Sequence, residues 1–476
     1  MAIKTVGSQA FEKGWVTVIP AHLLEEGASP NAQNVDFSES FGRLTKRKGH
    51  SVLYTAGANS EVCGLHELIT SAGTTHILAA ANDDVYEVTG SGTWTSVFNA
   101  AAMNGVNTSF CTFNDLAIFV NENITTQKWN GAGASSNLLG SPPANVKWVC
   151  AHKSRVFMAN SSAGASRLHY SASDDGEDWT TADSAGFIDV SPDDGDEITG
   201  IVSIGNALLI FKKLSTWVMQ GFSPTTFTLK QVSPSVGCVA GKTIIRCDSF
   251  AIFLAQDGVY AATPSGVSLL SYNIKPTIDA ISDSVKMTAC AGKLRTQYWL
   301  CIDADGNGEN DEVYVLDYVL GVWGRYTNKK EKVFLRRNDG TLISGGDEDD
   351  IIRKHDDTDN DSGSAVSMIW DTKDYDFDDW VARKEPHDVI VMAEVLSGKT
   401  VTITHLVDGL ASATTQSFSL TRAGGYDKVY HTGRGFPTAS AGGRFLRLRF
   451  SNAESDARVK ILGFSLQASV SERQNG

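Results

Sequence analysis

The sequence contains no long run of apolar residues. Its longest apolar stretches, such as DVIVMAEVL at residues 388–396, are far shorter than the roughly 20 residues that a membrane-spanning helix needs. The opening residues, MAIKTVGSQAFEKGW, also lack the apolar segment of a signal peptide. We therefore expect a chain without a membrane span that is made in a cytoplasm and stays there at least initially.

Cysteine pairs of the CxxC type are absent. The chain has seven cysteines, an odd number, and several lie in apolar, strand-like contexts such as KWVCAH and YWLCID. These features favour buried free thiols over a zinc site or a framework of disulfides. The cysteines are Cys63, Cys111, Cys150, Cys238, Cys247, Cys290 and Cys301.

Positive charge is in the minority. The chain has 41 Lys and Arg residues against 55 Asp and Glu residues, which gives a formal net charge of −14. A protein that grips nucleic acid through the phosphates gains affinity when its basic surface releases counterions. The balance argues against a dedicated nucleic-acid binder, although it is compatible with a surface that DNA merely passes.

The motifs of common catalytic sites are absent as well. The ten histidines show neither HExxH nor HxH spacing, and the chain contains no GxSxG sequence and no P-loop. We therefore predict a protein that is not an enzyme and that needs no cofactor.

What the chain does contain is a repeat of short alternating strands separated by Gly, Asn, Asp and Ser. Residues 77–92, ILAAANDDVYEVTGSG, align with residues 251–266, AIFLAQDGVYAATPSG, at an offset of 174 residues (251 minus 77), or four periods of about 43. Seven copies can be counted between about residues 52 and 360, and this period suits one four-stranded blade. The sequence thus predicts an all-β fold built on a six- or seven-bladed β-propeller.

The repeat occupies only part of the chain. Closing a propeller usually draws a strand from one terminus into the blade built by the other, and residues 36–54 are well placed to supply it. The repeat stops at HDDTDNDSGS (355–364), for which we predict an exposed linker. Longer alternating strands such as RFLRLRFS then indicate a half-solvated antiparallel sheet. We predict three parts, which are an irregular lead-in with the closing strand at residues 1–50, the propeller at residues 51–365, and a β-sandwich-like domain at residues 366–476.

The stretch YSASDDGEDW is similar to an Asp-box, a hairpin loop found in sialidases and other β-propellers. Asp174, Gly176 and Trp179 keep the spacing of that motif, whereas Ala172 and Asp178 stand where it has Ser and Thr. In the motif the Asp side chain accepts backbone N–H groups and the Trp fills space between blades. We therefore assign these residues a structural turn and blade packing rather than catalysis.

A sialidase would also need three converging arginines, a Tyr nucleophile with a Glu partner, and an acidic Asp. Nothing in the sequence shows that the arginines of the blades converge; they include Arg155, Arg167, Arg246 and Arg295. The alternative function is therefore a carbohydrate-binding or glycan-processing β-propeller. It would need aromatic and acidic side chains that meet at the mouth of the propeller.

The loop DADGNGENDE imitates the start of a calcium-binding EF-hand. Asp303, Asp305, Asn307 and Gly308 are in register with that motif, but its twelfth position, which should be a Glu, is Tyr314. Two interpretations stay open, a polar hairpin tip and a weak structural Ca²⁺ site. The acidic runs GDEDD and HDDTDND could likewise hold cations, although such runs are more often solvated loops.

The densest basic cluster is RLTKRKGH. It contains Arg43, Lys46, Arg47 and Lys48. One interpretation is a solvated edge strand whose charge prevents aggregation. The functional interpretation is a contact with an acidic neighbour, either nucleic acid or an adjoining subunit.

Several stretches, taken in order, carry a resemblance to a known family. They are NAQNVDFSESFGRLTKRKGH, HYSASDDGEDW, ITGIVSIGNALLIFKKLSTWVMQG, VGCVAGKTI and EVYVLDYVLGVWGRY, followed by the C-terminal alternating strands. In this order the chain resembles the tail nozzle proteins of short-tailed bacteriophages, also called tail tubular protein B or packaged-DNA stabilisation proteins. The resemblance spans about residues 30 to 470.

The resemblance implies a structural virion protein of the phage tail, synthesised in the host bacterial cytoplasm. Its partners would be further copies of itself, in a ring that is expected to be a hexamer, the portal or head-to-tail adaptor ring, and a tail fibre, spike or needle. Double-stranded DNA would pass through the ring without specific binding. No catalytic residues come with the family.

Overall fold

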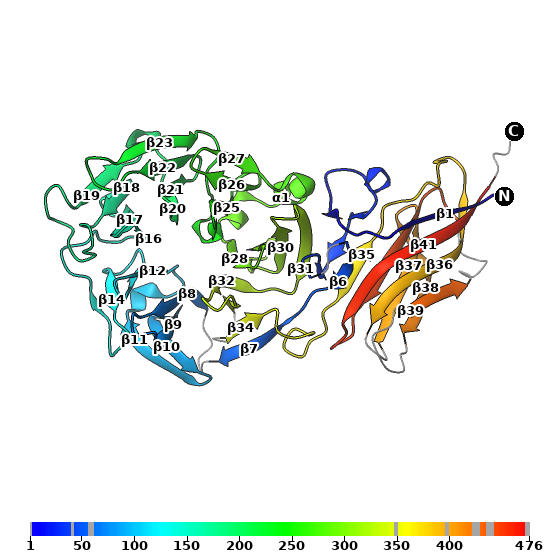
Figure 1. The fold of residues 1–476 in the computed structure, drawn as a ribbon, viewed down its shortest axis with the longest axis horizontal. Coiled ribbons are helices and arrows are strands. Elements are labelled where there is room, and N and C mark those ends of the chain that lie inside the picture. The colour runs from blue at the N-terminus through cyan, green and yellow to red at the C-terminus, as the bar shows by residue number, and fades with distance from the viewer. Residues whose placement is uncertain are drawn as a thin grey trace.

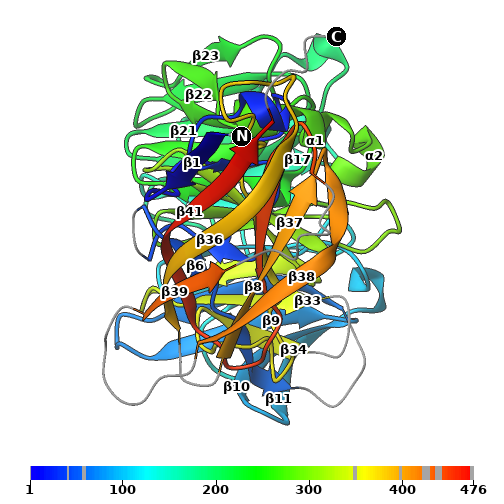
Figure 2. The same ribbon diagram turned by 90° about the vertical axis from the view of Figure 1, so that its right-hand side faces the viewer.

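The computed structural model describes residues 2–39, 42–55, 61–346, 351–395, 399–420, 429–434 and 442–471. In this part of the chain strands dominate, and they form a ring of blades with a sandwich of two sheets beside it (Figure 1). Viewed from the sandwich end, strands of the sandwich run across the front of the propeller (Figure 2).

The ring consists of seven four-stranded antiparallel blades within the described residues, each with its first strand innermost. The first three blades are β8 (Val62–Ile69), β9 (Thr75–Ala81), β10 (Asp84–Gly90) and β11 (Thr93–Asn99); β12 (Ser109–Phe113), β13 (Leu116–Val120), β14 (Gln127–Trp129) and β15 (Ser136–Asn137); and β16 (Trp148–His152), β17 (Arg155–Ser161), β18 (Gly164–Tyr170) and β19 (Gly186–Asp189).

The fourth to seventh blades continue around the ring. They are β20 (Ile198–Ile204), β21 (Ala207–Lys212), β22 (Thr216–Gln220) and β23 (Thr228–Ser233); β24 (Ile245–Cys247), β25 (Phe250–Leu254), β26 (Val259–Thr263) and β27 (Gly266–Leu269); β28 (Cys290–Leu294), β29 (Gln297–Ile302), β30 (Glu312–Asp317) and β31 (Val322–Thr327); and β32 (Glu331–Arg336), β33 (Leu342–Gly346) and β34 (Ile351–His355) with β7 (His50–Thr55).

Each blade buries its faces against its neighbours. Phe211 of the fourth blade and Phe253 of the fifth, for example, lie with ring centroids 4.7 Å apart in a cluster built by both blades. Similar clusters join the first blade to the second and the third to the fourth. Because one blade cannot bury both faces alone, the repeated alternating strands are stable only as a ring.

The ring closes through a strand from the N-terminal part of the chain. Strand β7 is the outermost strand of the seventh blade and pairs with β34, with His50 opposite His355 and Thr55 opposite Ile351. The closing strand expected within residues 36–54 is thus found at residues 50–55. The all-β fold predicted from the sequence is confirmed, and the propeller has seven blades.

The sandwich has two sheets. One orders its strands β39-β36-β41-β6-β5, with β1 also paired to β41, and the other continues β4-β35-β40-β37-β38. The bounds are β1 (Ala2–Ser8), β4 (Ala32–Gln33), β5 (Val35–Asp36), β6 (Leu44–Lys46), β35 (Met368–Asp371), β36 (Lys384–Val395), β37 (Lys399–Val407), β38 (Leu410–Leu420), β39 (Val429–Arg434), β40 (Leu446–Asn452) and β41 (Val459–Val470). In β40 the alternation expected from RFLRLRFS is present, with leucines and Phe450 buried and the arginines on the other face.

The prediction of an irregular lead-in, made for the first 35 residues, is wrong for residues 2–8. Strand β1 pairs with β41 along its whole length, from Ala2 opposite Val470 to Ser8 opposite Phe464. The pattern of AIKTVGS is too weak to mark a strand, and its partner lies at the other end of the sequence. The first residues therefore belong to the sandwich.

The two domains share a sheet. The outer strand of the sixth blade, β31, pairs with β4, which pairs in turn with β35, so a nine-stranded sheet runs from the propeller into the sandwich. Arg325 is opposite Gln33, and Gln33 is opposite Ile369. The boundary expected between residues 365 and 366 is therefore crossed by hydrogen-bonded strands.

Short elements complete the fold. They are β2 (Gly14–Trp15), β3 (Ala28–Ser29), α1 (Lys275–Asp279), α2 (Asp283–Lys286) and the 3-10 turns at Ala21–Leu23, Ala101–Met103, Pro192–Asp194, Gly241–Thr243 and Tyr272–Ile274. None of the helices found in the described residues has the length and apolar character needed to cross a membrane.

Candidate functional site

The Asp-box-like stretch forms a turn that packs between blades. Trp179 is 9 % exposed, lies in a cluster contributed by the second and third blades, and donates its indole N–H to the Gly176 carbonyl at 3.0 Å. Asp174 adopts a left-handed backbone with φ of 60°. The carboxylates that accept backbone N–H groups belong instead to Asp175 and to Asp178, the residue that replaces the Thr of the motif.

The EF-hand-like loop is a hairpin between β29 and β30. The buried carboxylate of Asp303, 2 % exposed, accepts the backbone N–H groups of Gly306 at 2.7 Å, Asn307 at 3.2 Å and Gly308 at 2.8 Å. Asn307 donates its side-chain amide to Asp305 at 3.2 Å. These contacts fix the loop, because carboxylates in such turns replace missing backbone partners.

Sequence reasoning missed one member of this loop. Carboxylate oxygens of Asp303, Asp305 and Asp311 lie within 4.8 Å of one another, an arrangement that could hold a hard cation such as Ca²⁺. Burial, together with the neighbouring Asp305 and Asp303 charges, raises the pKa of Asp311. Asp311 occupies the ninth position of the EF-hand motif, counted from Asp303, so the sequence pattern could have identified it. The other acidic loop, GDEDD, lies outside the described residues apart from its glycine.

The basic cluster does not form a contact surface, so that prediction is wrong for its two central residues. Lys46 and Arg47 are each 3 % exposed. Lys46 donates to the Asn452 side chain and to the Glu454 carbonyl, both at 2.8 Å. Arg43 is exposed near Glu394, and Lys48 is half-buried.

Arg47 belongs instead to a buried junction between the two domains. Its guanidinium binds both carboxylate oxygens of Asp361, at 3.0 and 2.7 Å. Lys329, which precedes β32, lies 3.1 Å from the same carboxylate, and His50 of β7 lies 2.9 Å from it. Burial alone would raise the pKa of the Asp361 carboxyl, but hydrogen bonds from His50 and Arg47 and the charge of Lys329 hold it far below its usual range.

This junction corrects the prediction of an exposed acidic linker. Besides Asp361, three further acids of HDDTDNDSGS are engaged in ion pairs within the described residues. They are Asp356 with Arg295, Asp357 with Lys354, and Asp359 with Arg458. Its acids are therefore paired with groups of both domains, whereas Asp357 and residues 362–364 are exposed as expected.

The innermost strands surround the axis of the propeller. Five of them carry a cysteine: Cys63, Cys111, Cys150, Cys247 and Cys290 lie on β8, β12, β16, β24 and β28. The cysteines are free, as predicted, and burial raises the pKa of several of these thiols, that of Cys150 to about 11. Thiols that stay protonated are unreactive, so a packing role fits them.

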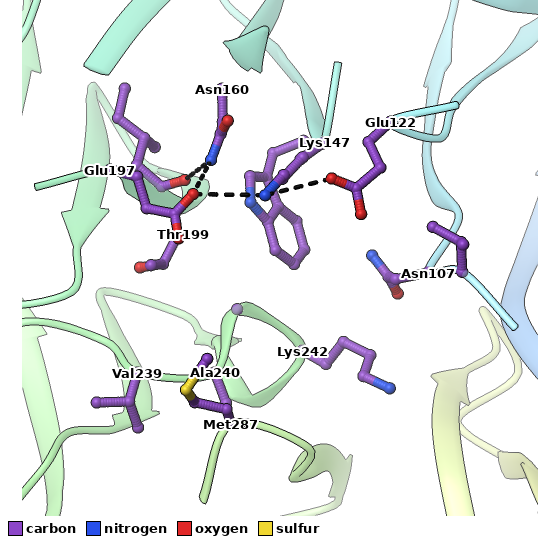
Figure 3. A pocket seen from close by; sticks show the side chains of 14 residues that line it. Asn107, Glu122, Lys147, Asn160, Glu197, Thr199, Val239, Ala240, Lys242 and Met287 are labelled. Atoms are coloured by element: carbon purple, nitrogen blue, oxygen red, sulfur yellow. Dashed lines mark hydrogen bonds and ion pairs between the residues drawn. The ribbon is translucent and has the colours of Figure 1, made fainter. Parts of the chain in front are cut away.

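A cavity of about 240 Å³ lies at one end of the axis, where β12, β16, β20 and β24 begin (Figure 3). We call this end the upper mouth. In it Lys147 lies between two carboxylates, 3.3 Å from Glu122 and 3.4 Å from Glu197, and Asn160 donates to Glu197 at 2.8 Å (Figure 3). Burial lowers the pKa of Lys147, but the two carboxylates outweigh it and raise the pKa.

The two carboxylates of the upper mouth are thus bound within the protein. Trp148 is an aromatic residue in the lining, and a side chain on Gly241 would collide with its indole, so the glycine backbone covers part of the ring. Met287, at the rim, is half exposed. The cavity offers a small volume with polar and apolar walls, without the open aromatic face that sugar binding uses.

The arginines considered for a sialidase site do not converge in the described residues. Arg155 is buried and donates to the carbonyls of Ser171 and Ser184, and Arg167 binds Asp189. Arg295, as noted, pairs with Asp356. Arg246 lies on the innermost strand of the fifth blade.

Seven four-stranded blades around one axis define the chain as a β-propeller protein with an attached sandwich. No protein-family model matches the chain, and no curated protein shows a significant match.

Solved structures resemble the propeller only distantly. The extracellular domain of a protein described as a one-component system from B. thetaiotaomicron matches with a TM-score of 0.46 and 10 % identity, over 64 % of this chain and 39 % of that one. YCF48 bound to D1 peptide gives 0.42 and 9 %, over 64 % and 94 %; the Neurospora crassa Pan2 WD40 domain gives 0.39 and 8 %, over 65 % and 89 %. These likenesses concern the fold and carry no argument about function.

Proposed function

We propose that the chain is a non-enzymatic structural protein that forms, with further copies of itself, the ring-shaped nozzle of a short-tailed phage tail. Such a ring extends the DNA channel below the portal and adaptor, helps to retain the genome, and supports fibres, a spike or a needle. The protein is then a virion component made in the bacterial cytoplasm. The order of the sequence stretches described above is the starting point for this proposal.

The structural observation that supports it best is the stiff connection between the domains. A nine-stranded sheet passes from the sixth blade into the sandwich, and the buried Asp361 carboxylate binds side chains contributed by the sandwich side, the closing strand and the seventh blade. A subunit that bears the load of a packaged genome benefits from having no hinge. Arg155, Arg167 and Arg295, each bound to partners of its own, also fit a scaffold better than a site where arginines converge on a substrate.

The charge of the chain suits a conduit. A formal net charge of −14 per copy repels duplex DNA, and screening confines that repulsion to within about 8 Å of the surface at physiological salt. Because every phosphate contact would slow ejection, a wall that binds DNA weakly is an advantage.

A second candidate is a carbohydrate-binding propeller. The upper mouth favours it in one respect, since Trp148, Glu122 and Glu197 lie around one cavity. Both carboxylates are bound to Lys147 and the indole is partly covered, which makes this candidate the weaker one. A glycan array with the purified chain tests it, and specific binding that is lost in Trp148→Ala would favour it over the nozzle.

The deciding experiment is single-particle electron microscopy of the full chain at high concentration, with native mass spectrometry of the same sample. We expect a closed ring, a hexamer in the preferred case, with an axial opening wide enough for duplex DNA. Because such rings can require a template, the experiment is repeated with portal and adaptor rings from a short-tailed phage. A chain that stays monomeric in both samples contradicts the proposal.

A further inference from the structure

The upper mouth is a cavity that is sized for a single side chain. Its volume of about 240 Å³ is below the roughly 300–1,000 Å³ of pockets that hold drug-sized ligands. The lining runs from Val106, before the second blade, to Met287, before the sixth. Solvent reaches it, because the side chains of Glu122 and Glu197 are 43 % and 46 % exposed. A ligand can therefore enter from this end of the propeller axis.

The polar wall of this cavity is held together loosely. Lys147 Nζ lies 3.3 Å from the Oε2 atom of Glu122 and 3.4 Å from the Oε2 atom of Glu197. Both distances exceed the roughly 2.7–2.9 Å of a charge-assisted hydrogen bond. One ammonium group thus spans two carboxylates without binding either of them closely. Burial lowers the pKa of Lys147, yet the charges of Glu197 and Glu122 raise it overall, so the electrostatic potential at this wall favours positive charge.

Acceptor atoms remain free at the same wall. Lys147 and Asn160 both contact the Oε2 atom of Glu197, and at Glu122 the contact is again made by Oε2. The Oε1 atoms of the two carboxylates accept no hydrogen bond from any residue that the structure describes. The side-chain amide of Asn107, which lies beside Glu122 in the lining, has no hydrogen-bond partner in that part of the chain either (Figure 3). The wall can therefore accept several further N–H donors.

The opposite wall of the cavity is partly apolar (Figure 3). Val239 and Ala240 are buried there, and Met287 is half exposed at the rim. Methionine is flexible and adapts its shape to a neighbouring group. The charged residue of this wall, Lys242, donates to the Lys332 carbonyl at 3.3 Å, so its ammonium group is held toward the seventh blade. A ligand with an alkyl stem and a charged end thus finds a surface for each part.

We infer that the upper mouth binds an arginine side chain of a partner protein. The guanidinium lies between Glu122 and Glu197 and donates to their free oxygens and to the Asn107 amide oxygen. Its methylene stem packs along Val239 and Met287. A guanidinium group carries five N–H donors in a planar fork, so it serves two carboxylates better than a single ammonium group does. A formal net charge of −14 also draws a basic partner toward the chain. This inference does not depend on the nozzle proposed above.

The test measures binding of N-acetylarginine methylamide, a capped arginine, to the full chain by ligand-observed NMR at low ionic strength. We expect saturable binding with a dissociation constant on the order of 1 mM, weakened by added salt. Capped citrulline has nearly the same shape but a neutral urea group, and it should bind about ten-fold more weakly. A short glycine-serine peptide with one central arginine represents the partner segment and should bind at least as tightly as the capped arginine.

Variants test which groups of the protein take part. Glu122→Gln keeps the shape of the side chain but removes its charge, and it should weaken binding of the capped arginine about ten-fold. Lys147→Met removes the ammonium group that competes for both carboxylates and should strengthen binding about three-fold. Glu12→Gln changes an exposed glutamate of the N-terminal segment and is the matched control, with no expected change. The melting temperature of each variant shows whether it is folded.

Several results would overturn the inference. They are no binding of the capped arginine by the native chain, equal binding of capped arginine and capped citrulline, unchanged binding by Glu122→Gln, and weaker binding by Lys147→Met. Failure of the peptide to bind where the capped arginine does would also overturn it, because the mouth would then admit a small guanidine but no protein segment. Capped lysine that binds as tightly as capped arginine would do the same, since the site would then recognise any positive charge.

Discussion

The positively charged side chains at the domain junction differ in their surroundings from two arginines on innermost strands of the propeller. At the junction Arg47 and Lys329 are buried and share the Asp361 carboxylate. Arg246 of β24 and Arg336 of β32 are exposed and unpaired among the described residues. Burying a charge is costly unless a partner compensates it, whereas an exposed charge costs little and stays available.

The number of charged residues within a short stretch of sequence therefore does not predict whether those residues bind a partner or stabilise the fold. RLTKRKGH concentrates basic residues within a few positions, yet its central pair holds the fold together. Arg246 and Arg336 stand far apart in the sequence, and each lies on an innermost strand of the ring. Stability measurements on both sets of residues test this contrast.

The largest effect is expected for Asp361→Asn. The change leaves Arg47 and Lys329 buried without a counter-charge, and we expect the free energy of unfolding to fall by about 5 kcal/mol, the upper end of the range for a broken buried pair. Denaturant unfolding followed by tryptophan fluorescence measures it. Asp248→Asn, on an exposed acid, is the control; equal stability of the two variants would contradict the role assigned to the junction.

The next largest loss of stability is expected when a buried apolar side chain is removed. Trp179→Ala should lower the free energy of unfolding by roughly 3–5 kcal/mol, because the indole fills the space between the second and third blades. Thermal unfolding monitored by circular dichroism is the measurement. Trp380→Ala, which removes a Trp that is 65 % exposed, provides the comparison and should change little. An unchanged melting temperature for Trp179→Ala would mean that the ring is not packed there.

The carboxylate of the β29–β30 hairpin should have an intermediate effect. Asp303→Ala removes the acceptor of three backbone N–H groups and should cost about 1–3 kcal/mol, since those donors become unsatisfied. Asp305→Ala removes an exposed carboxylate of the same loop and should cost less. Repeating the measurement with added Ca²⁺ shows whether the cation stabilises the native loop, an effect that both variants should lose.

The pH dependence of the free energy of unfolding tests the contribution of the Asp361 carboxylate. Its pKa is lowered in the folded state, so its contribution is present above the ordinary Asp value near 3.9 and is lost as the pH falls toward the folded pKa. We expect the native chain to lose about 1 kcal/mol more than Asp361→Asn on going from neutral pH to about pH 3. Parallel pH profiles of the two proteins would show that Asp361 is not responsible.

The smallest effect is expected for the two exposed arginines of β24 and β32. Arg246→Ser with Arg336→Ser should change the free energy of unfolding by no more than about 0.5 kcal/mol, because exposed charges without partners contribute little to stability. Urea denaturation of the double variant and of Arg444→Ser, which removes an exposed arginine of the sandwich, gives the comparison. A loss of several kcal/mol would show that these arginines have structural partners and would remove the contrast with the junction.

The blades could be predicted from sequence because each is built from local hairpins. The match between residues 77–92 and 251–266 reflects strands β9 and β10 in one blade and β25 and β26 in another. The closing strand was predictable for the same reason, since a ring of such units must be completed from one end. Pairing between strands that are neighbours in the sequence can be predicted from short-range sequence patterns.

Contacts between distant parts of the chain were not predictable in this way. Nothing in AIKTVGS points to β41, and nothing near Arg47 identifies Asp361 as its partner more than 300 residues away. Asp311 could have been found, because it stands at a position where related loops supply a ligand. Whether a charge is buried depends on packing, which composition and spacing do not report.

The strand that closes the propeller also sets the order in which the chain can mature. Strand β7 leaves the ribosome early but must wait for β34, and β1 must wait for β41 at residues 459–470. At typical rates of synthesis, about 300 residues take roughly 15–60 s, during which both early strands have unpaired edges. A nascent chain can therefore close the propeller only after residue 355 has emerged, and it can complete the sandwich only after residue 470. Prematurely terminated products would lack β41 and, with it, the partner of β1.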